Sequence, residues 1–222
     1  CSVRRQRQMC IRDSGEPGDY LTDKLTDAAV DFIDQSGESP FLLYFSYYTV
    51  HGPIMAKPAL VEKYTEKAKT FKNTRNEKVR PPYAGMIESL DDSVGRILEK
   101  LETQGLAENT VVLFTADNGG VSEASSGGLR GSKALAYEGG IREPFIVRWP
   151  SRVEAGSTCV VPVIGNDIYP TLLEMANLEP KPDCHRDGLS LVPLLTQTSP
   201  ALGRDALSVS YTHLRAHETG YN

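Results

Sequence analysis

The chain has 222 residues, of which 24 are lysine or arginine and 29 are aspartate or glutamate, so its net charge is −5. Its length allows one hydrophobic core, and no apolar run reaches the roughly 18 residues of a membrane-spanning helix. The arginine-rich run of residues 4–8 (RRQRQ) would by itself suggest nucleic acid binding, but the rest of the chain has no basic patch.

The two ends of the chain can be encoded by opposite strands of one DNA segment. Residues 9–13 (MCIRD) translate ATG TGT ATA AGA GAC, and the reverse complement of that string translates as VSYTH, the sequence of residues 209–213. Both ends therefore resemble a translated sequencing adapter, and we expect residues 1–14 and 209–222 to be adapter-derived and residues 15–208 to be the native part. The alternative is a native basic arm and a native histidine-containing tail.

Excluding the ends changes the net charge and leaves fewer cysteines and histidines. The net charge falls from −5 to −8, because five of the 24 basic and two of the 29 acidic residues lie there. The remaining cysteines, Cys159 and Cys184, lack the CxxC spacing of a zinc site, so they either form a disulfide or are two buried thiols. The native histidines are His51 and His185, and His185 is expected to be structural or exposed.

The first half of the native part predicts three helices and a buried strand. Apolar residues recur at helical spacing over residues 20–33. The aromatic run PFLLYFSYYTV over residues 40–50 predicts a buried strand. Residues 57–82 are polar and predict a short helix and an exposed loop, whereas residues 83–104 carry a clear apolar stripe and predict a long helix.

The second half predicts two strands and a helix. Apolar residues indicate strands over residues 110–116 and 144–149, and residues 167–176 read as a helix with Asp167 at its N-cap. Alternating strands and helices favour a layered α/β fold with a largely parallel sheet.

Two oxygen-bearing side chains follow the strand predicted over residues 110–116. Asp117 and Asn118 lie where open α/β sheets bind their ligands, and Gly119 and Gly120 permit the chain to turn there. Carboxylate and amide oxygens suit a hard cation such as Ca²⁺ or Mg²⁺. On its own, the sequence Asp-Asn-Gly-Gly would indicate a plain turn.

A single lysine lies on a glycine-rich loop after that strand. Lys133 follows Gly127, Gly128 and Gly131, and such a loop lets the backbone approach an anionic group that the ammonium can contact. The loop lacks the GxxxxGK[ST] pattern of a nucleotide-binding loop. Without further context Lys133 would be interpreted as a surface lysine.

His51 ends the strand predicted over residues 40–50, and Pro53 stiffens the turn behind it. A histidine at this position can hydrogen-bond an oxyanion or protonate a leaving group near neutral pH. A histidine that merely closes the strand through a hydrogen bond is the alternative.

Several motifs resemble one enzyme family in the family's own order. These motifs are YTVHGP, LFTADNGG, the block LRGSKALAYEGGIREPFIVRWP, and DIYPTLLEMANL followed by DGLSLVPLL. They resemble the formylglycine-dependent, arylsulfatase-like sulfatases of the alkaline-phosphatase-like superfamily. The resemblance covers nearly all of residues 15–208 and implies an alkaline-phosphatase-like layered α/β fold.

The resemblance assigns roles to the candidate residues. Asp117 and Asn118 would be two ligands of a bound calcium ion, with Mg²⁺ possible. Lys133 and His51 would contact the oxygens of a sulfate ester and would be the catalytic and substrate-binding residues of this chain. Residues 138–142 would shape the loop that holds Lys133.

The departures from the family pattern matter as much as the matches. The family's nucleophile is a cysteine in Cys-x-Pro-Ser-Arg that is converted to formylglycine, and this motif does not occur here. Pro150-Ser151-Arg152 only imitates its tail, because Arg148 stands where the cysteine would be. The upstream aspartates of the metal site and the C-terminal small sheet are also missing, so residues 15–208 are expected to be part of a sulfatase catalytic domain, inactive alone.

The expected function of the parent enzyme is therefore sulfuric ester hydrolysis, acting on a small-molecule or glycan sulfate ester in the periplasm or outside the cell. No nucleic acid partner is expected, and the oligomeric state is open. The alternatives are a phosphoryl-transfer hydrolase of the same superfamily and a non-catalytic, calcium-stabilised binding module. Asn118 favours the sulfatase, because phosphoryl-transfer relatives often carry histidine at that position for a second metal.

Overall fold

The computed structural model describes residues 18–71, 80–121 and 127–207. The predicted adapter segments, residues 1–14 and 209–222, lie outside the described residues.

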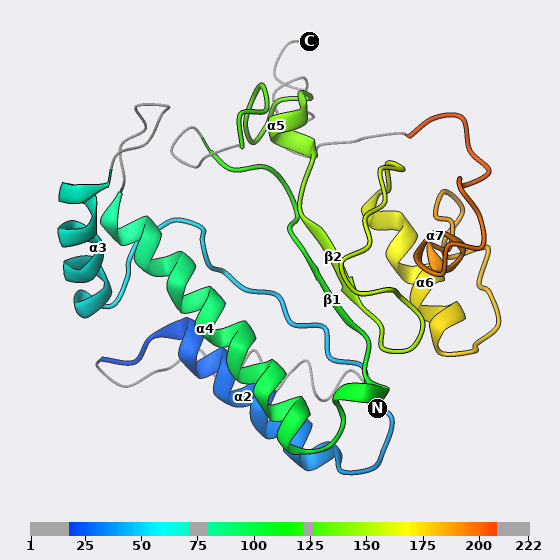
Figure 1. Ribbon diagram of the computed structural model, residues 1–222, viewed down its shortest axis with the longest axis horizontal. Coiled ribbons are helices and arrows are strands. Elements are labelled where there is room, and N and C mark those ends of the chain that lie inside the picture. Colours follow the sequence, from blue (N-terminus) through cyan, green and yellow to red (C-terminus); the bar gives the residue numbers. More distant parts are fainter. Residues whose placement is uncertain (1–17, 72–79, 122–126, 208–222) are drawn as a thin grey trace, which may run out of the picture. The chain divides into compact units, whose positions relative to one another are not determined.

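The chain divides into two compact units, which comprise residues 1–107 and residues 108–222. The first unit is helical. Figure 1 shows its long helix α4 (Pro81–Thr103), against which α2 (Leu21–Ser36) and α3 (Pro58–Thr70) both pack. The helices predicted over residues 20–33 and 83–104, and the short helix predicted within residues 57–82, are thus confirmed. Residues 72–79, in the exposed loop predicted after that short helix, lie outside the described residues.

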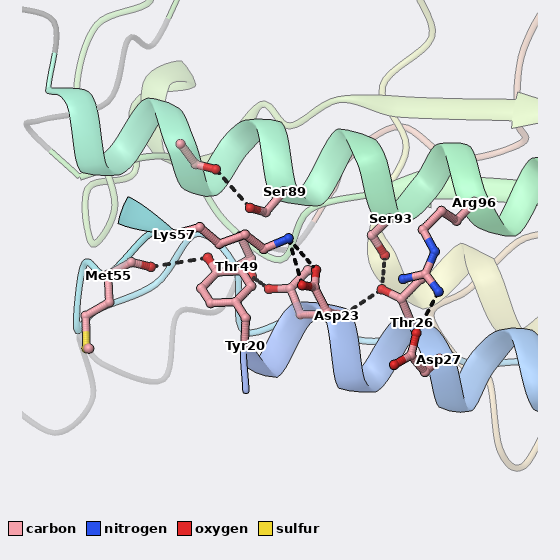
Figure 2. A network of polar contacts seen from close by, with 12 residues as sticks. Tyr20, Asp23, Thr26, Asp27, Thr49, Met55, Lys57, Ser89, Ser93 and Arg96 are labelled. Atoms are coloured by element: carbon pink, nitrogen blue, oxygen red, sulfur yellow. Dashed lines mark hydrogen bonds and ion pairs between the residues drawn. The ribbon is translucent and has the colours of Figure 1, made fainter. Parts of the chain in front are cut away.

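The interface between α2 and α4 contains buried hydroxyl groups beside apolar side chains. Thr26 is 0% exposed, and its hydroxyl donates to the Thr22 carbonyl oxygen over 2.6 Å and bonds to the Ser93 hydroxyl. The Tyr47 hydroxyl lies 2.8 Å from the same Ser93 oxygen. Figure 2 shows Thr26 and Ser93 pointing toward one another from the two helices. Small hydroxyl residues therefore let the helices approach closely while satisfying each other's hydrogen bonds.

The segment over residues 40–50, predicted as a buried strand, is extended but forms no strand with any described residue. Its side chains alternate between half-buried and exposed positions, and the exposed row includes Leu42, Tyr44 and Tyr48, which are 71%, 84% and 71% exposed. This alternation has the period of two of an extended backbone. A strand also needs a hydrogen-bonded neighbour, and the described residues provide none to this segment.

The second unit contains a two-stranded sheet, of β1 (Val112–Thr115) and β2 (Phe145–Arg148). Both strands were predicted, but they pair antiparallel, with Thr115 opposite Phe145, and not in the expected parallel arrangement. Parallel neighbours need a crossover connection, usually a helix of several turns. Among the described residues between the strands the only helix is the four-residue α5 (Glu138–Ile141), so the chain simply turns back.

The rest of the second unit is a small helical cluster around Asp167. The 3₁₀ turn η2 (Gly165–Asp167) leads into α6 (Ile168–Met175), which packs against α7 (Val192–Leu195). Asp167 is the N-cap residue of α6, as predicted, but its side chain does not cap that helix. Its carboxylate instead accepts hydrogen bonds from the Ile164 and Leu189 amides and from Arg204. It therefore joins three segments of the chain.

Candidate active site

The end of β1 is held by the backbone of α5. The chain leaves β1 at Thr115 and bends at Asp117 and Asn118, and the next amide, that of Gly119, donates to the carbonyl oxygen of Gly140 over 3.0 Å. Asp117 is exposed and Asn118 is half-buried. The predicted metal ligands, Asp117 and Asn118, thus follow the end of β1, and the residue after them, Gly119, is held by a backbone hydrogen bond.

Lys133 lies beside the same strand end. Its amide donates to the carbonyl oxygen of Gly120 over 2.9 Å, and its side chain is half-buried. Gly120 is two residues after Asn118, so the structure brings the backbone of the predicted lysine to the backbone of the predicted metal ligands. Gly120 and Lys133 are more than a dozen positions apart in the sequence.

Glycines make this meeting of loops possible. A Cβ on Gly119 would lie 2.1 Å from the carbonyl oxygen of Gly139, and a Cβ on Gly139 would lie 2.3 Å from that of Gly131. A Cβ on Gly140 would lie 2.2 Å from the carbonyl oxygen of Leu135. These approaches leave no room for any side chain. We call these four glycines, Gly119, Gly131, Gly139 and Gly140, the glycine crossing.

An arginine and a tyrosine brace the loop from outside the glycine crossing. The guanidinium of Arg130 lies 4.0 Å from the centre of the Tyr137 ring and donates to the Tyr137 hydroxyl over 3.0 Å. The Arg130 carbonyl oxygen also accepts the Gly139 amide over 2.7 Å. The loop that carries Lys133 is therefore fixed on both sides of the lysine by contacts within the loop itself.

Glu143 is a residue near the strand end that sequence reasoning missed. It precedes β2, and continuing the antiparallel register from the pair Thr115–Phe145 by two residues places it opposite Asp117. Its Oε1 atom is buried and has no hydrogen-bond partner among the described residues. Burial raises the pKa of the Glu143 carboxyl, and the negative charge of Asp117 raises it further. The signal was available only once the antiparallel pairing was known.

His51 belongs to the first unit, whereas Asp117, Asn118 and Lys133 belong to the second. It is exposed and lies in a turn in which its amide donates to the Tyr48 carbonyl oxygen over 2.7 Å. Its Nδ1 atom lies 3.0 Å from the Gly52 carbonyl oxygen. The structure thus brings three of the four predicted residues together, and it describes His51 within its own unit.

The donor set at the end of β1 fits a hard divalent cation. Asp117 and Asn118 offer oxygen atoms, and the unpartnered Oε1 of Glu143 is a further one on the opposite strand. Oxygen donors are those that Ca²⁺ and Mg²⁺ prefer. Across the described residues no group of three or more histidines, cysteines, aspartates or glutamates is placed to hold a metal.

The first unit contains a shallow groove that is unrelated to the predicted site. It has a volume of about 680 Å³ and is lined mainly by charged residues of α2 and α4. Figure 2 shows that Asp23 is paired with Lys57 over 2.7 Å and Asp27 with Arg96 over 2.6 Å. These carboxylates already have cationic partners, so the groove does not compete with the end of β1 as a metal site.

The remaining predictions concern cysteines, the second histidine and the membrane. Cys159 and Cys184 are both free and exposed, so the prediction of buried thiols is wrong. His185 accepts the Lys181 amide at Nε2 over 3.1 Å, as a structural histidine would. No described helix combines the length and the apolar character that crossing a bilayer requires.

Comparisons with known proteins give a consistent result. The family model described as Sulfatase matches residues 3–178. The steryl-sulfatase of Rattus norvegicus is 34% identical over 192 residues, which are 81% of this chain and 31% of that protein. The N-acetylgalactosamine-6-sulfatase of Mus musculus is 36% identical over 194 residues, which are 83% of this chain and 34% of that protein. The chain thus spans about a third of the length of these curated relatives.

Solved structures agree in fold. The crystal structure of Ps i-CgsB superposes with a TM-score of 0.72 at 32% identity, over 84% of this chain and 42% of that one. The same protein in complex with k-i-k-neocarrahexaose gives a TM-score of 0.71 at 33% identity, over 80% and 39% of the two chains. The phosphonate monoester hydrolase SpPMH from Silicibacter pomeroyi shares the fold alone, with a TM-score of 0.61 at 20% identity over 83% and 43%.

Proposed function

The chain belongs to the sulfatase family, and from this premise we propose that the whole protein hydrolyses a sulfate ester at a site to which His51, Asp117, Asn118 and Lys133 contribute. The observation that carries the proposal is the hydrogen bond from the Lys133 amide to Gly120, which holds a lysine beside the end of β1. The Lys133 ammonium group, which would bind the anionic ester, then lies at the same edge of the sheet as Asp117 and Asn118, whose oxygen atoms would bind a divalent metal.

Asp117 and Asn118 are the residues of this chain that would hold the divalent cation, which we propose to be Ca²⁺, with Mg²⁺ as the second candidate. A bound divalent cation would polarise the sulfate oxygens and neutralise negative charge that they carry. Asp117 brings one negative charge and Asn118 a neutral oxygen. The fixed bend after β1 orients both side chains before any metal binds.

Lys133 would place its ammonium group against the sulfate oxygens, where its charge opposes the charge that develops as the ester bond breaks. Since the loop on both sides of Lys133 is fixed by backbone hydrogen bonds, little reorganisation is needed when substrate binds. His51 would donate a proton to the bridging oxygen as the alcohol leaves, a task that suits an imidazole near neutral pH.

In the mechanism that we propose, no residue of this chain is the nucleophile. We propose that it is the formylglycine of a Cys-x-Pro-Ser-Arg motif elsewhere in the whole protein. The substrate class is a sulfate monoester, carried by a glycan or by a small molecule, and the location is periplasmic or extracellular, as expected for the family. The two alternatives, phosphoryl transfer and a non-catalytic binding module, have no observation that favours them.

The proposal is tested with the complete protein that contains this sequence, assayed on 4-nitrophenyl sulfate and 4-nitrophenyl phosphate. We expect the sulfate to be hydrolysed with the higher kcat/KM, and Asp117→Asn to lower that activity far more than Asp183→Asn, which changes an exposed residue of the same unit. A preference for the phosphate would establish the phosphoryl-transfer alternative. Hydrolysis of neither ester by protein that binds Ca²⁺ would establish the binding module.

A further inference from the structure

The strand that returns beside β1 brings a second carboxylate to the predicted cation site. β1 and β2 pair antiparallel with Thr115 opposite Phe145, and the next residue before β2 is Pro144, which has no amide hydrogen to continue the ladder. One step further, Glu143 comes opposite Asp117. The hydrogen bond from the Gly119 amide to the Gly140 carbonyl oxygen, over 3.0 Å, keeps the two segments side by side beyond Asp117 and Glu143.

The Glu143 carboxylate has an oxygen atom for which the described residues provide no partner. Its Oε1 atom is buried without a hydrogen bond to any of them, although buried polar atoms are nearly always hydrogen-bonded. Among the described residues, the negative charge of Asp117 acts on this carboxyl and raises its pKa. The neighbouring arginines in the sequence are engaged elsewhere, Arg142 with Glu138 over 3.1 Å and Arg148 with Glu108 over 3.8 Å.

A carboxylate with a buried oxygen atom is repelled by a second carboxylate near it unless a positive charge compensates them. The described side chains provide no such charge to Glu143, whereas a divalent cation held by Asp117 and Asn118 would supply it. The cation would also give the buried Oε1 atom the partner that it lacks.

We propose that Glu143 is a third oxygen-donating residue of the cation site at the end of β1, together with Asp117 and Asn118. This inference rests on the proposed function, because it takes the cation site of that function as its starting point. Glu143 adds a second full negative charge to this chain's share of the site. Ligand charge is one of the main determinants of Ca²⁺ affinity.

The test is a calorimetric titration with Ca²⁺ alone of the complete protein that contains this sequence, comparing wild type with Glu143→Gln, Asp117→Asn and Glu179→Gln. Glu143→Gln keeps the shape of the side chain and removes its charge, and Glu179→Gln makes the same change of charge at an exposed position of the same unit. We expect Glu143→Gln and Asp117→Asn each to weaken Ca²⁺ binding about tenfold or more. Glu179→Gln should change it less than twofold.

A second readout keeps the inference testable if a variant is less well folded. In metal-free buffer Glu143→Gln should melt at the same temperature as wild type or higher, because it removes a charge that faces Asp117, while the rise in melting temperature on adding Ca²⁺ should shrink. A loss of affinity in Asp117→Asn with none in Glu143→Gln would overturn the inference and leave the proposed cation site standing. No loss in either variant, or no binding by wild type, would overturn both.

Discussion

The two units of this chain hold their functional and structural side chains in place by different means. In the helical unit, α2 and α4 meet through side chains, among them the hydroxyls of Thr26 and Ser93. In the unit that carries Lys133, the backbone of one loop lies directly on the backbone of another at the glycine crossing. A side-chain interface can relax around a substitution, whereas a backbone crossing cannot. The position of the predicted catalytic lysine should therefore be the less tolerant of the two.

The largest expected effect is at the glycine crossing itself. Gly139→Ala would put a methyl group 2.3 Å from the Gly131 carbonyl oxygen, and we expect it to destabilise the second unit by about 3 kcal/mol or more. The chain's single tryptophan, Trp149, follows β2, so urea unfolding monitored by its fluorescence reports on that unit.

The matched control is a glycine of the helical unit. Gly95 lies inside α4 with nothing within 4 Å of the position of a Cβ, so Gly95→Ala should stabilise that unit by roughly 0.5–1 kcal/mol. Equal and small effects of the two substitutions would mean that the glycine crossing does not restrain the loop.

The next effect compares an ion pair in each unit. Asp167 is 0% exposed, and both oxygens of its carboxylate accept from Arg204 over 2.7 Å. Removing one partner of a buried ion pair leaves the other charge buried without a partner, so Arg204→Ala should destabilise the second unit by about 3 kcal/mol. Arg96→Ala removes the exposed pair with Asp27 and should change stability by less than about 1 kcal/mol.

The same pair predicts an acid-sensitive stability of the second unit. Burial alone would raise the pKa of the Asp167 carboxyl, but hydrogen bonds from Arg204 and from two backbone amides hold it below its ordinary value of 3.8. The stabilisation is therefore fully present above that value and is lost as the pH falls below it. Tryptophan fluorescence measured from pH 6 down to acid should show wild type losing stability in this range, and Arg204→Ala should show a smaller loss.

A smaller effect is expected in the helix interface. Ser93→Ala removes the hydroxyl that serves both Thr26 and Tyr47, and we expect a loss of about 1–2 kcal/mol in unfolding followed by far-UV circular dichroism. In the double variant Thr26→Val/Ser93→Ala both partners are apolar, so its loss should be less than the sum of the two single losses. Strict additivity would show that the hydroxyls do not act as a pair.

The smallest effect is a gain of stability next to Lys133. Ala134 has a φ of 72°, a backbone conformation that glycine adopts without strain and alanine does not. Ala134→Gly should therefore be neutral or stabilise the second unit by up to about 1 kcal/mol, measured by the tryptophan fluorescence. A clear loss of stability would mean that the loop does not hold this conformation in solution.

Much of the fold was readable in the sequence, because long apolar stripes define α2 and α4 and short apolar runs define β1 and β2. The run over residues 40–50 was misread as a paired strand, since its alternating side chains reveal an extended backbone but not the neighbour that would pair with it. The antiparallel direction of β2 could not be predicted from the sequence either, because it depends on the path of the loop between β1 and β2.

For the candidate site, the sequence identified the residues but not what holds them. Asp117 and Lys133 stand out by chemistry, and the resemblance assigned residues 138–142 to the loop that holds Lys133. The close approach of Gly139 to the Gly131 carbonyl oxygen, which restrains this loop, is known only from the structure. Glu143 escaped notice for a related reason. Its position opposite Asp117 follows from the antiparallel register and not from any local pattern.

The central claim is that the loop fixed by the glycine crossing presents Lys133 to a sulfate ester. It is tested most directly by the kcat/KM of the complete protein on 4-nitrophenyl sulfate, with Lys133→Ala compared against Lys181→Ala, a change at an exposed lysine of the same unit. We expect Lys133→Ala to lower kcat/KM about 100-fold or more and Lys181→Ala to leave it within twofold. Equal activity of the two variants would contradict the account.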